Sequence, residues 1–225
     1  MAYKHGVYTS EVPTSVVPAV NTTAGLPVVF GTAPVHLASE RAQSNKPILC
    51  YSYAEAVQQL GYSKDWTKYT LCEVMYSQFA LYNRGPVVFV NVLDPKTHKK
   101  STSSKNVTVT NKVAKVDAPV LLDTLQIKAS TAGSALIAGS DYEAAYDDDG
   151  VLVITLLDDG TATAASNLTL TYDEIDAAAV DADDIIGGIN VSDGSVKGLE
   201  CLNKVFPITG LVPGIVLAPG WSENP

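Results

Sequence analysis

The spacing of apolar residues changes along the chain and separates predicted strands from predicted helices. Short apolar runs that are rich in β-branched residues and bounded by glycine, proline or polar residues are typical of strands buried on both faces. Such runs occupy residues 26–33, 46–51, 86–93 and 214–218. All of them are far shorter than the ~18 apolar residues that a membrane-spanning helix needs.

Between these runs the apolar spacing becomes helical. Ser52, followed three residues later by Glu55, matches a capping box and predicts a short helix that ends at Gly61. A second helix is predicted from about residue 67 to 83 and a third over residues 195–206. The side chains expected to face inward are Leu71, Val74, Met75, Gln78, Phe79 and Tyr82 in the second helix, and Val196, Leu199, Leu202, Val205 and Phe206 in the third. Strands alternating with helices predict an α/β or α+β layer with a mixed, partly parallel sheet and covering helices.

The middle of the chain has a different pattern. Short segments of strand composition are separated there by turn-forming sequences such as Asp-Gly. These segments are residues 106–110, 125–129, 142–146, 151–156 and 168–172. Strands spaced by about ten residues are typical of small antiparallel folds, so we expect an inserted antiparallel β-sandwich or barrel.

Residues 5–20 are extended in character, because polar and apolar positions alternate and prolines exclude a helix. They carry too little apolar surface to fold alone, so we interpret them as an arm that needs a partner. The residues expected to pair with a neighbouring subunit are His5, Gly6, Val7, Tyr8, Thr9, Glu11 and Val12.

Charge divides the chain in the same way. Residues 99–190 contain 6 basic and 15 acidic residues, so this stretch holds essentially all of the net charge of −9. The basic stretch 98–105 is predicted to be a linker or loop. The predicted division is an arm at 1–24, a discontinuous α/β domain at 25–98 plus 185–225, and an acidic β-rich insertion at 99–184. A sheet of this kind needs a further helix to cover its last strand, so we expect the chain to be an N-terminal piece of a longer protein.

The composition excludes several classes of protein. With 46% hydrophobic and 17% charged residues, the chain is not intrinsically disordered. Its first residues lack the pattern of a secretory signal peptide. The 3 cysteines lie in apolar surroundings and argue against a disulfide framework. A net charge of −9 argues against wrapping DNA or binding an anionic membrane.

Candidate chemistry is sparse. Asp147, Asp148 and Asp149 lack a glutamate in the register of the best-defined calcium loops, so a solvated hairpin turn is the better interpretation. A second acidic cluster is interpreted as the solvated end of a linker; it consists of Asp181, Asp183 and Asp184. None of the histidines has a cysteine or carboxylate at metal-ligand spacing; they are His5, His36 and His98. The cysteines are expected to be buried apolar residues, since no cations flank Cys50, Cys72 or Cys201.

Motifs for catalysis or nucleotide binding are absent from the sequence, including Gly-x-Ser-x-Gly, Gly-x-Gly-x-x-Gly and the Walker loop. Trp66 and Trp221 lie near the ends of predicted elements, where an amphipathic ring packs at a rim. We therefore predict no catalytic residues, no metal and no cofactor.

Several short motifs follow one another along residues 1–98 and 185–225. They are His5-Gly-Val-Tyr-Thr-Ser-Glu-Val-Pro13, Pro47-Ile-Leu49 followed by Ala54-Glu-Ala-Val57, Ala80-Leu-Tyr-Asn83 leading to Pro86-Val-Val-Phe-Val-Asn-Val92, Gly198-Leu199, and Pro213-Gly-Ile-Val-Leu-Ala-Pro-Gly220. Taken in this order, they resemble the N-terminal portion of the tail sheath proteins of contractile bacteriophages and phage-like injection systems.

The resemblance implies a structural subunit of the virion tail, assembled in the bacterial host cytoplasm. Such subunits polymerise around an inner tube and shorten to drive tube penetration and genome ejection, without a nucleotide. Their partners would be neighbouring sheath subunits, the inner tube protein, and baseplate and terminator proteins, with no nucleic acid bound directly and no membrane insertion. The N-terminal arm would add a strand to a neighbour's sheet. This chain alone would be monomeric, and its acidic insertion would face outward.

Two other classes remain open at this stage. A surface-binding or adhesin module would need exposed aromatic residues in the insertion, for which Tyr142, Tyr146 and Tyr172 are available. A small α/β enzyme would place its site at the carboxyl ends of the strands, near Gly31-Thr32, Asp94 and Pro219-Gly220. Only one carboxylate, and no base or nucleophile in an activating context, is found there.

Overall fold

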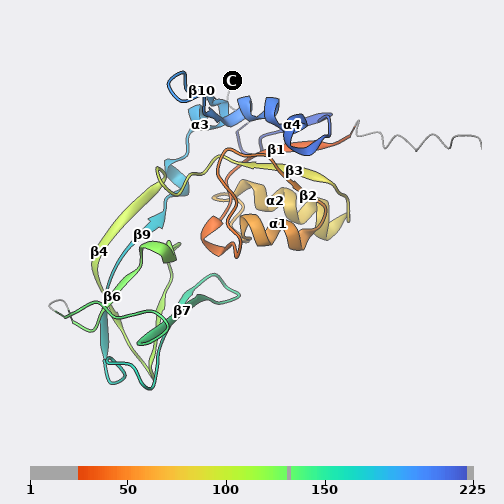
Figure 1. Cartoon of the computed structure of the whole chain (residues 1–225). Coiled ribbons are helices and arrows are strands. Elements are labelled where there is room, and N and C mark those ends of the chain that lie inside the picture. The colour runs from red at the N-terminus through yellow and green to blue at the C-terminus, as the bar shows by residue number, and fades with distance from the viewer. Residues whose placement is uncertain (1–24, 131–132, 222–225) are drawn as a thin grey trace, which may run out of the picture.

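A computed structural model describes residues 25–130 and 133–221 (Figure 1). It contains an α/β part and, joined to it by two segments, a β-rich insertion (Figure 1). The predicted arm, residues 1–24 with its pairing positions His5, Gly6, Val7, Tyr8, Thr9, Glu11 and Val12, lies outside the described residues.

The α/β part is built on a four-stranded sheet in the order β12-β1-β3-β2. The strands are β1 (Pro27–Gly31), β2 (Ile48–Cys50), β3 (Val87–Asn91) and β12 (Ile215–Leu217). β1 runs parallel to both β3 and β12, and β2 runs antiparallel to β3. The predicted mixed, partly parallel sheet is therefore confirmed.

The two central strands are buried on both faces, which explains their unbroken apolar sequence. Val29, Val87 and Phe89 point into a cluster formed with α1 and α2. Val28, Val88 and Val90 point the other way, into a cluster with Cys201 and Val205 of the C-terminal segment. Figure 1 shows α1 and α2 on one side of the sheet and α4 on the other.

Helix α1 (Tyr53–Leu60) has the predicted cap with one difference. The Ser52 hydroxyl accepts a hydrogen bond from the Glu55 backbone N–H at 3.3 Å. The Glu55 carboxylate accepts from the backbone N–H of Tyr51 at 2.7 Å, one residue before the position of a standard capping box. The helix ends where Gly61 adopts a positive φ of 74°, a conformation that glycine adopts without steric cost.

The helix predicted over residues 67–83 is shorter and changes type. An α-helix, α2 (Thr70–Met75), continues as a π-helical segment, Tyr76–Leu81. A π-helix has more residues per turn than an α-helix, so the side chains beyond Met75 rotate away from the predicted face. Phe79 remains buried, but Tyr82, predicted to face inward, is 69% exposed.

The helix predicted over residues 195–206 is also wrong in its bounds. The chain forms a short strand, β11 (Val196–Lys197), a 3₁₀-helix, Gly198–Lys204, and then α4 (Val205–Thr209). The three-residue period of the 3₁₀-helix puts Cys201 on the buried side and leaves Leu199 partly exposed. Phe206, predicted to face inward, is 58% exposed.

The insertion contains two three-stranded antiparallel sheets, in the orders β4-β9-β6 and β5-β8-β7. The strands are β4 (Lys99–Thr108), β5 (Val113–Val116), β6 (Gln126–Lys128), β7 (Tyr142–Tyr146), β8 (Leu152–Leu156) and β9 (Asn167–Ile175). Both sheets contribute to one hydrophobic cluster. The antiparallel prediction holds, whereas among the described strands the sheets stay separate and form no barrel.

The basic stretch 98–105, predicted to be a linker, lies largely in β4. Its polar side chains are exposed because β4 has little apolar surface to bury, and its pairing with β9 supplies the strand geometry. Short elements complete the described chain. They are 3₁₀-helices Val35–Leu37, Leu122–Thr124 and Ala177–Ala179, helix α3 (Ala182–Ile186) and strand β10 (Gly188–Ile189).

Candidate functional site: an exposed sheet edge

Strand β12 lies at the edge of the α/β sheet and is more exposed than its sequence predicts. Ile215, Val216 and Leu217 are 47%, 46% and 38% exposed. β12 pairs with β1, and no described strand lies on its other side. An apolar edge strand is a template for pairing with further polypeptide. The prediction of a buried strand is therefore wrong for this chain, because burial would require a neighbour on the outer side.

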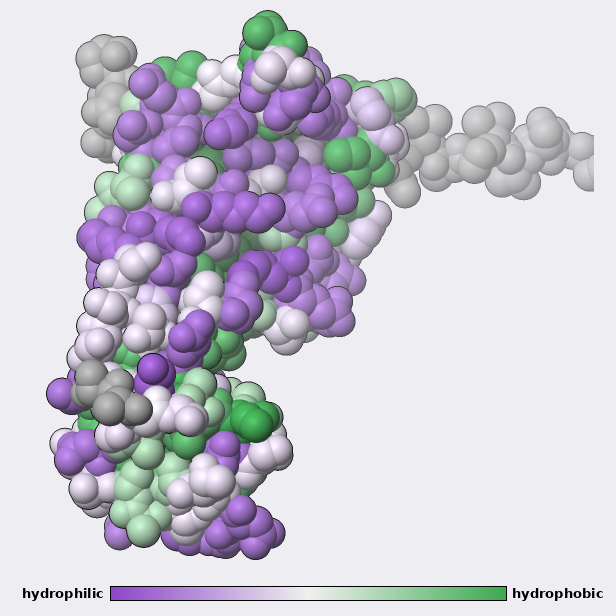
Figure 2. All heavy atoms as spheres, turned by 60° about the vertical axis from the view of Figure 1, so that its left-hand side comes forward, coloured by the Kyte–Doolittle hydropathy of each residue, from purple (hydrophilic) through white to green (hydrophobic). Residues whose placement is uncertain are grey.

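More apolar side chains are exposed in the same part of the chain. Among the described residues, 10 of the 16 exposed large hydrophobic side chains lie between residues 186 and 217. We call these ten residues the C-terminal apolar set: Ile186, Ile189, Val191, Leu199, Phe206, Ile208, Val212, Ile215, Val216 and Leu217. Figure 2 shows hydrophobic areas on the surface at the end of the molecule formed by this segment. Exposed apolar surface of this kind is typical of an interaction surface.

The carboxyl ends of the central strands, where an α/β enzyme would hold its site, are occupied by structural hydrogen bonds. The Thr32 hydroxyl donates to the Lys68 carbonyl at 2.7 Å and accepts from the Thr70 backbone N–H at 3.1 Å. The Asn91 side chain accepts from the backbone N–H groups of Ala33 and Leu93, each at 3.1 Å. These polar groups hold the chain together and are not free to bind a substrate.

The two acidic clusters have structural roles. Asp147, Asp148 and Asp149 lie in the turn between β7 and β8, which confirms the hairpin turn interpreted from the sequence. The Asp147 carboxylate accepts hydrogen bonds from two backbone N–H groups there. Asp181, predicted to be in a linker, instead caps α3 in a capping box with Asp184. Within the described residues, no group of three or more histidine, cysteine, aspartate or glutamate side chains could hold a metal ion.

His98 has a carboxylate partner that its sequence neighbours do not reveal. Its Nδ1 atom accepts from the Asp94 backbone N–H at 2.9 Å, and its Nε2 atom lies 3.1 Å from the Asp184 carboxylate. His98 belongs to the segment that leads into the insertion, and Asp184 to the segment that returns from it. The pair therefore ties the two connections together, and only the fold brings these residues into contact.

His36 is 8% exposed and packs between two tyrosine rings. Its ring centroid lies 6.0 Å from that of Tyr69 and 5.4 Å from that of Tyr146, which comes from the insertion. Burial, together with the positive charge of Arg41, lowers the pKa of His36 to about 3, so the ring is neutral at pH 7. Its Nδ1 atom is buried and has no hydrogen-bond partner among the described residues.

The cysteines and tryptophans supply no reactive site. Cys50, Cys72 and Cys201 are buried and free, and burial raises the pKa of each thiol, to about 12 for the first two. The prediction of inert apolar cysteines is confirmed. Trp66 packs against Tyr76 with the two rings tilted by 38° and their centroids 5.5 Å apart, and Trp221 packs at the edge of the main core.

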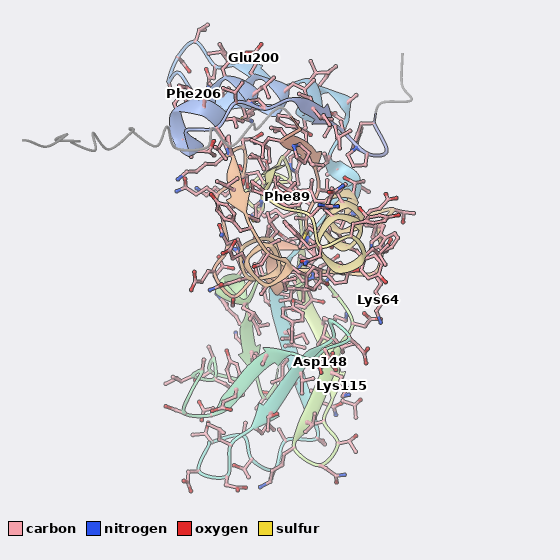
Figure 3. The ribbon with its side chains drawn as sticks, turned by 90° about the vertical axis from the view of Figure 1, so that its right-hand side faces the viewer. Lys64, Phe89, Lys115, Asp148, Glu200 and Phe206 are labelled. Atoms are coloured by element: carbon pink, nitrogen blue, oxygen red, sulfur yellow. The ribbon has the colours of Figure 1, made fainter. Side chains whose placement is uncertain are left out.

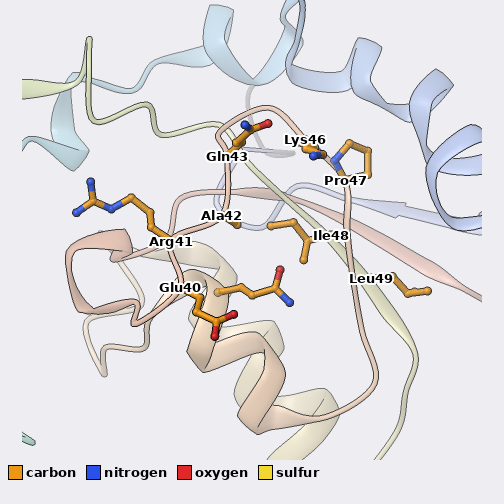
Figure 4. A pocket seen from close by; sticks show the side chains of 9 residues that line it. Glu40, Arg41, Ala42, Gln43, Lys46, Pro47, Ile48 and Leu49 are labelled. Carbon is orange, nitrogen blue, oxygen red and sulfur yellow. The ribbon is translucent and has the colours of Figure 1, made fainter.

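A pocket of about 480 Å³ lies beside the loop that leads into β2 (Figure 4). Its lining comes almost entirely from residues 40–49, with Gln59 contributed by α1. The Arg41 side chain beside it is engaged, because its Nε–H donates to the Val35 carbonyl at 3.2 Å. The polar residues of its lining are Glu40, Arg41, Gln43, Lys46 and Gln59.

The aromatic platform that an adhesin would need is absent from the described part of the insertion. Tyr142 and Tyr172 are 5% and 2% exposed and belong to its core. Tyr146 is half-buried, and its hydroxyl donates to the Val120 carbonyl at 2.6 Å. These three residues therefore serve packing.

The feature that stands out in the described residues is thus the exposed apolar edge strand β12. A comparison with curated proteins finds a protein that the chain is similar to. The tail sheath protein of Burkholderia phage BcepMu is 29% identical to this chain, and the match covers 97% of this chain. This similarity confirms the resemblance found in the motifs. The chain spans 43% of the length of that relative.

No family model matches the chain, and no solved structure matches it. Among the described helices, none is both long and apolar enough to cross a membrane.

Proposed function

We propose that this chain is part of a structural subunit of a contractile tail sheath. The subunit polymerises around an inner tube and shortens to drive tube penetration and genome ejection. The observation that carries the proposal is the edge of β12, which no second described strand pairs with and where three apolar side chains are left partly exposed. The resemblance to a tail sheath protein supplies the kind of assembly.

The edge of β12 supports assembly for a physical reason. Soluble proteins protect edge strands with charges, prolines or bulges, because an unprotected edge pairs with other chains. Ile215, Val216 and Leu217 carry no charge, proline or bulge themselves, although β12 is only three residues long and Pro213 and Pro219 flank it. Further polypeptide of the assembled sheath would cover this edge and bury the apolar side chains, each Å² of apolar surface contributing roughly 25 cal/mol.

The N-terminal segment supplies a second part of the proposal. His5, Gly6, Val7, Tyr8, Thr9, Glu11 and Val12 would pair with the sheet of a neighbouring subunit. A connection made by backbone hydrogen bonds through an extended arm lets the globular parts rotate while the subunits stay linked. The work of contraction is then stored at assembly, with no enzymatic activity and no cofactor.

The proposed domains are the arm, the α/β domain of residues 25–98 plus 185–225, and the insertion of residues 99–184, which would face outward. The core of the α/β part also includes Leu121, Ile175 and Val180, so its packing extends past these sequence limits. The partners would be other sheath subunits, the tube protein, and baseplate and terminator proteins, in a virion tail assembled in the host cytoplasm.

Replacing Val216 with lysine tests the edge. The substitution places a charge on an exposed position, so we expect the chain to fold normally and assembly to be lost. An antibody against this chain, applied to ultracentrifuged lysates of the source organism after induction, should find the unsubstituted protein on pelleted tubular particles and the V216K variant in the soluble fraction.

A matched control places the same charge elsewhere. Ile137→Lys alters a 65% exposed apolar residue of the insertion and should leave the protein on the particles. If V216K and I137K both pellet with tubular particles, the β12 edge is not an assembly surface. If the unsubstituted protein is found only in the soluble fraction, the sheath function itself is wrong.

Deleting residues 1–20 tests the arm in the same assay. The deletion should leave the thermal unfolding of the chain unchanged, because this segment has too little apolar surface to form a core of its own. It should abolish tubular particles in the organism. Normal particles formed by the deletion variant would contradict the arm hypothesis. The β12 edge is tested independently by the V216K and I137K variants.

A further inference from the structure

A cleft of about 1050 Å³ separates the α/β part from the insertion. One wall is the loop between α1 and α2, residues 62–69, and the other is formed by loops and turns of the insertion, residues 117–119 and 146–150. The end of β9 and the residues after it, 174–178, close one side. Figure 3 shows Lys64 on the side of the α/β part that faces the insertion, and Asp148 on the insertion.

The cleft has more negative than positive charge. Seven carboxylate residues line it, together with three lysines. The carboxylates are those of Asp65, Asp117, Asp147, Asp148, Asp149, Glu174 and Asp176, and the lysines are Lys64, Lys68 and Lys100.

Most of the positive charge is already paired. Lys68 lies 3.0 Å from Asp65, and Lys100 lies 2.9 Å from Asp176. Among the described residues, no ion pair engages Asp117, Asp148, Asp149 or Glu174, and Lys64 alone cannot balance them. The cleft therefore keeps a surplus of carboxylates.

The cleft also has an aromatic lining with an unsatisfied polar group. His36, Tyr69 and Tyr146 form this lining from both parts of the molecule. His36 is 92% buried, since 8% of its surface is exposed, and its Nδ1 atom lacks a partner. A buried polar atom without a hydrogen bond is destabilising, and one ring nitrogen of a neutral imidazole can accept a hydrogen bond.

We propose that this cleft binds a basic side chain, arginine or lysine, presented by a protein partner. Tyrosine faces attract a guanidinium or ammonium group, carboxylates form charge-assisted hydrogen bonds with it, and a cleft of about 1050 Å³ has room for the aliphatic stem. A bare metal ion does not fit, because no three suitable ligands converge in the described residues.

The test uses the whole chain and the peptide Ac-Gly-Gly-Arg-Gly-Gly-amide. Binding is followed by NMR through the ring signals of His36, Tyr69 and Tyr146. The same peptide with citrulline in place of arginine has the same shape without the charge. We expect saturable shifts of these rings with the arginine peptide and at least a tenfold weaker effect with the citrulline peptide.

A pair of double variants supplies the matched control. Asp148→Asn with Asp149→Asn removes two exposed charges from the cleft but keeps Asp147, which holds the turn. Asp158→Asn with Asp159→Asn removes two charges from another turn of the insertion that does not line the cleft. The first pair should weaken binding at least tenfold, and the second should leave it within twofold.

Each of three results would overturn the proposal: no ring shifts with the arginine peptide, equal shifts with citrulline, or equal weakening by both double variants. The last would show a general attraction to an acidic chain. Because the assay needs no assembly, its outcome is independent of the proposed sheath function.

Discussion

Replacing Phe89 with alanine is expected to lower the free energy of unfolding by about 3–5 kcal/mol. Phe89 lies in β3, a central strand, and has 0% of its surface exposed. Its ring lies 6.2 Å from that of Phe79, centroid to centroid, inside the cluster beneath α1 and α2. Removing the ring leaves a cavity that rigid strands on both sides cannot fill. Urea titration followed by circular dichroism measures the loss.

Phe206→Ala is the matched control for that measurement. Phe206 has 58% of its surface exposed, and Figure 3 shows it at the surface, whereas Phe89 lies inside. The same truncation there should cost less than about 1 kcal/mol. Similar losses for F89A and F206A would show that the sheet is not the stabilising core of the α/β part.

Replacing Gly187 with alanine is expected to destabilise the C-terminal segment by on the order of 3 kcal/mol or more. Gly187 has a φ of 70°, and an added Cβ would overlap the backbone carbonyl of Lys197. On the facing side, an added Cβ on Gly198 would overlap the carbonyls of Asp184 and Ile185. Because the obstacles are backbone atoms, no side-chain rotation relieves the overlap, and α3 must separate from the 3₁₀-helix.

Gly194→Ala separates the two effects in that prediction. Gly194 has the same φ of 70°, but nothing lies within 4 Å of an added Cβ. It should therefore cost only the left-handed backbone strain, about 1–2 kcal/mol. The Gly187 N–H donates to the Asp183 carbonyl at 2.7 Å. Hydrogen exchange at this amide reports whether the end of α3 separates from residues 197–198. Equal protection of that amide in G187A and the unsubstituted protein would refute the close approach.

Local sequence was sufficient wherever one short segment determines its own structure. The cap at Ser52 and the end of α1 at Gly61 follow from hydrogen bonds and dihedral angles within a few residues. The predicted central strands were confirmed because apolar β-branched runs between breakers have few other stable conformations. The hairpin at Asp147 follows from the Asp-Gly turn.

The predictions failed where helix type or partners decide burial. The period of an α-helix misplaced Tyr82 and Phe206, since the chain forms a π-helix in one place and a 3₁₀-helix in the other. These helix types give no distinct pattern over so few residues. The basic stretch in β4 became a strand through pairing with β9, a contact between distant parts of the chain.

The sequence predicted the strand of the candidate edge site but not its exposure. Residues 214–218 show that a strand forms, but identical apolar runs serve as central or edge strands, so exposure depends on which neighbours are present. The resemblance to sheath proteins came from motifs alone, because their order and spacing are properties of the chain.

The cleft could not be predicted from the sequence, because its lining comes from segments far apart in the chain. The sequence by itself determined the local elements, the acidic character of the insertion and the kind of protein that the chain resembles, since each depends on residues close together or on their order. Only the tertiary structure placed His36 beside Tyr146, joined His98 to Asp184 and put β12 at the edge of the sheet that the described strands form. Such contacts depend on how distant segments pack, and side-chain periodicity within one segment carries no information about its partner.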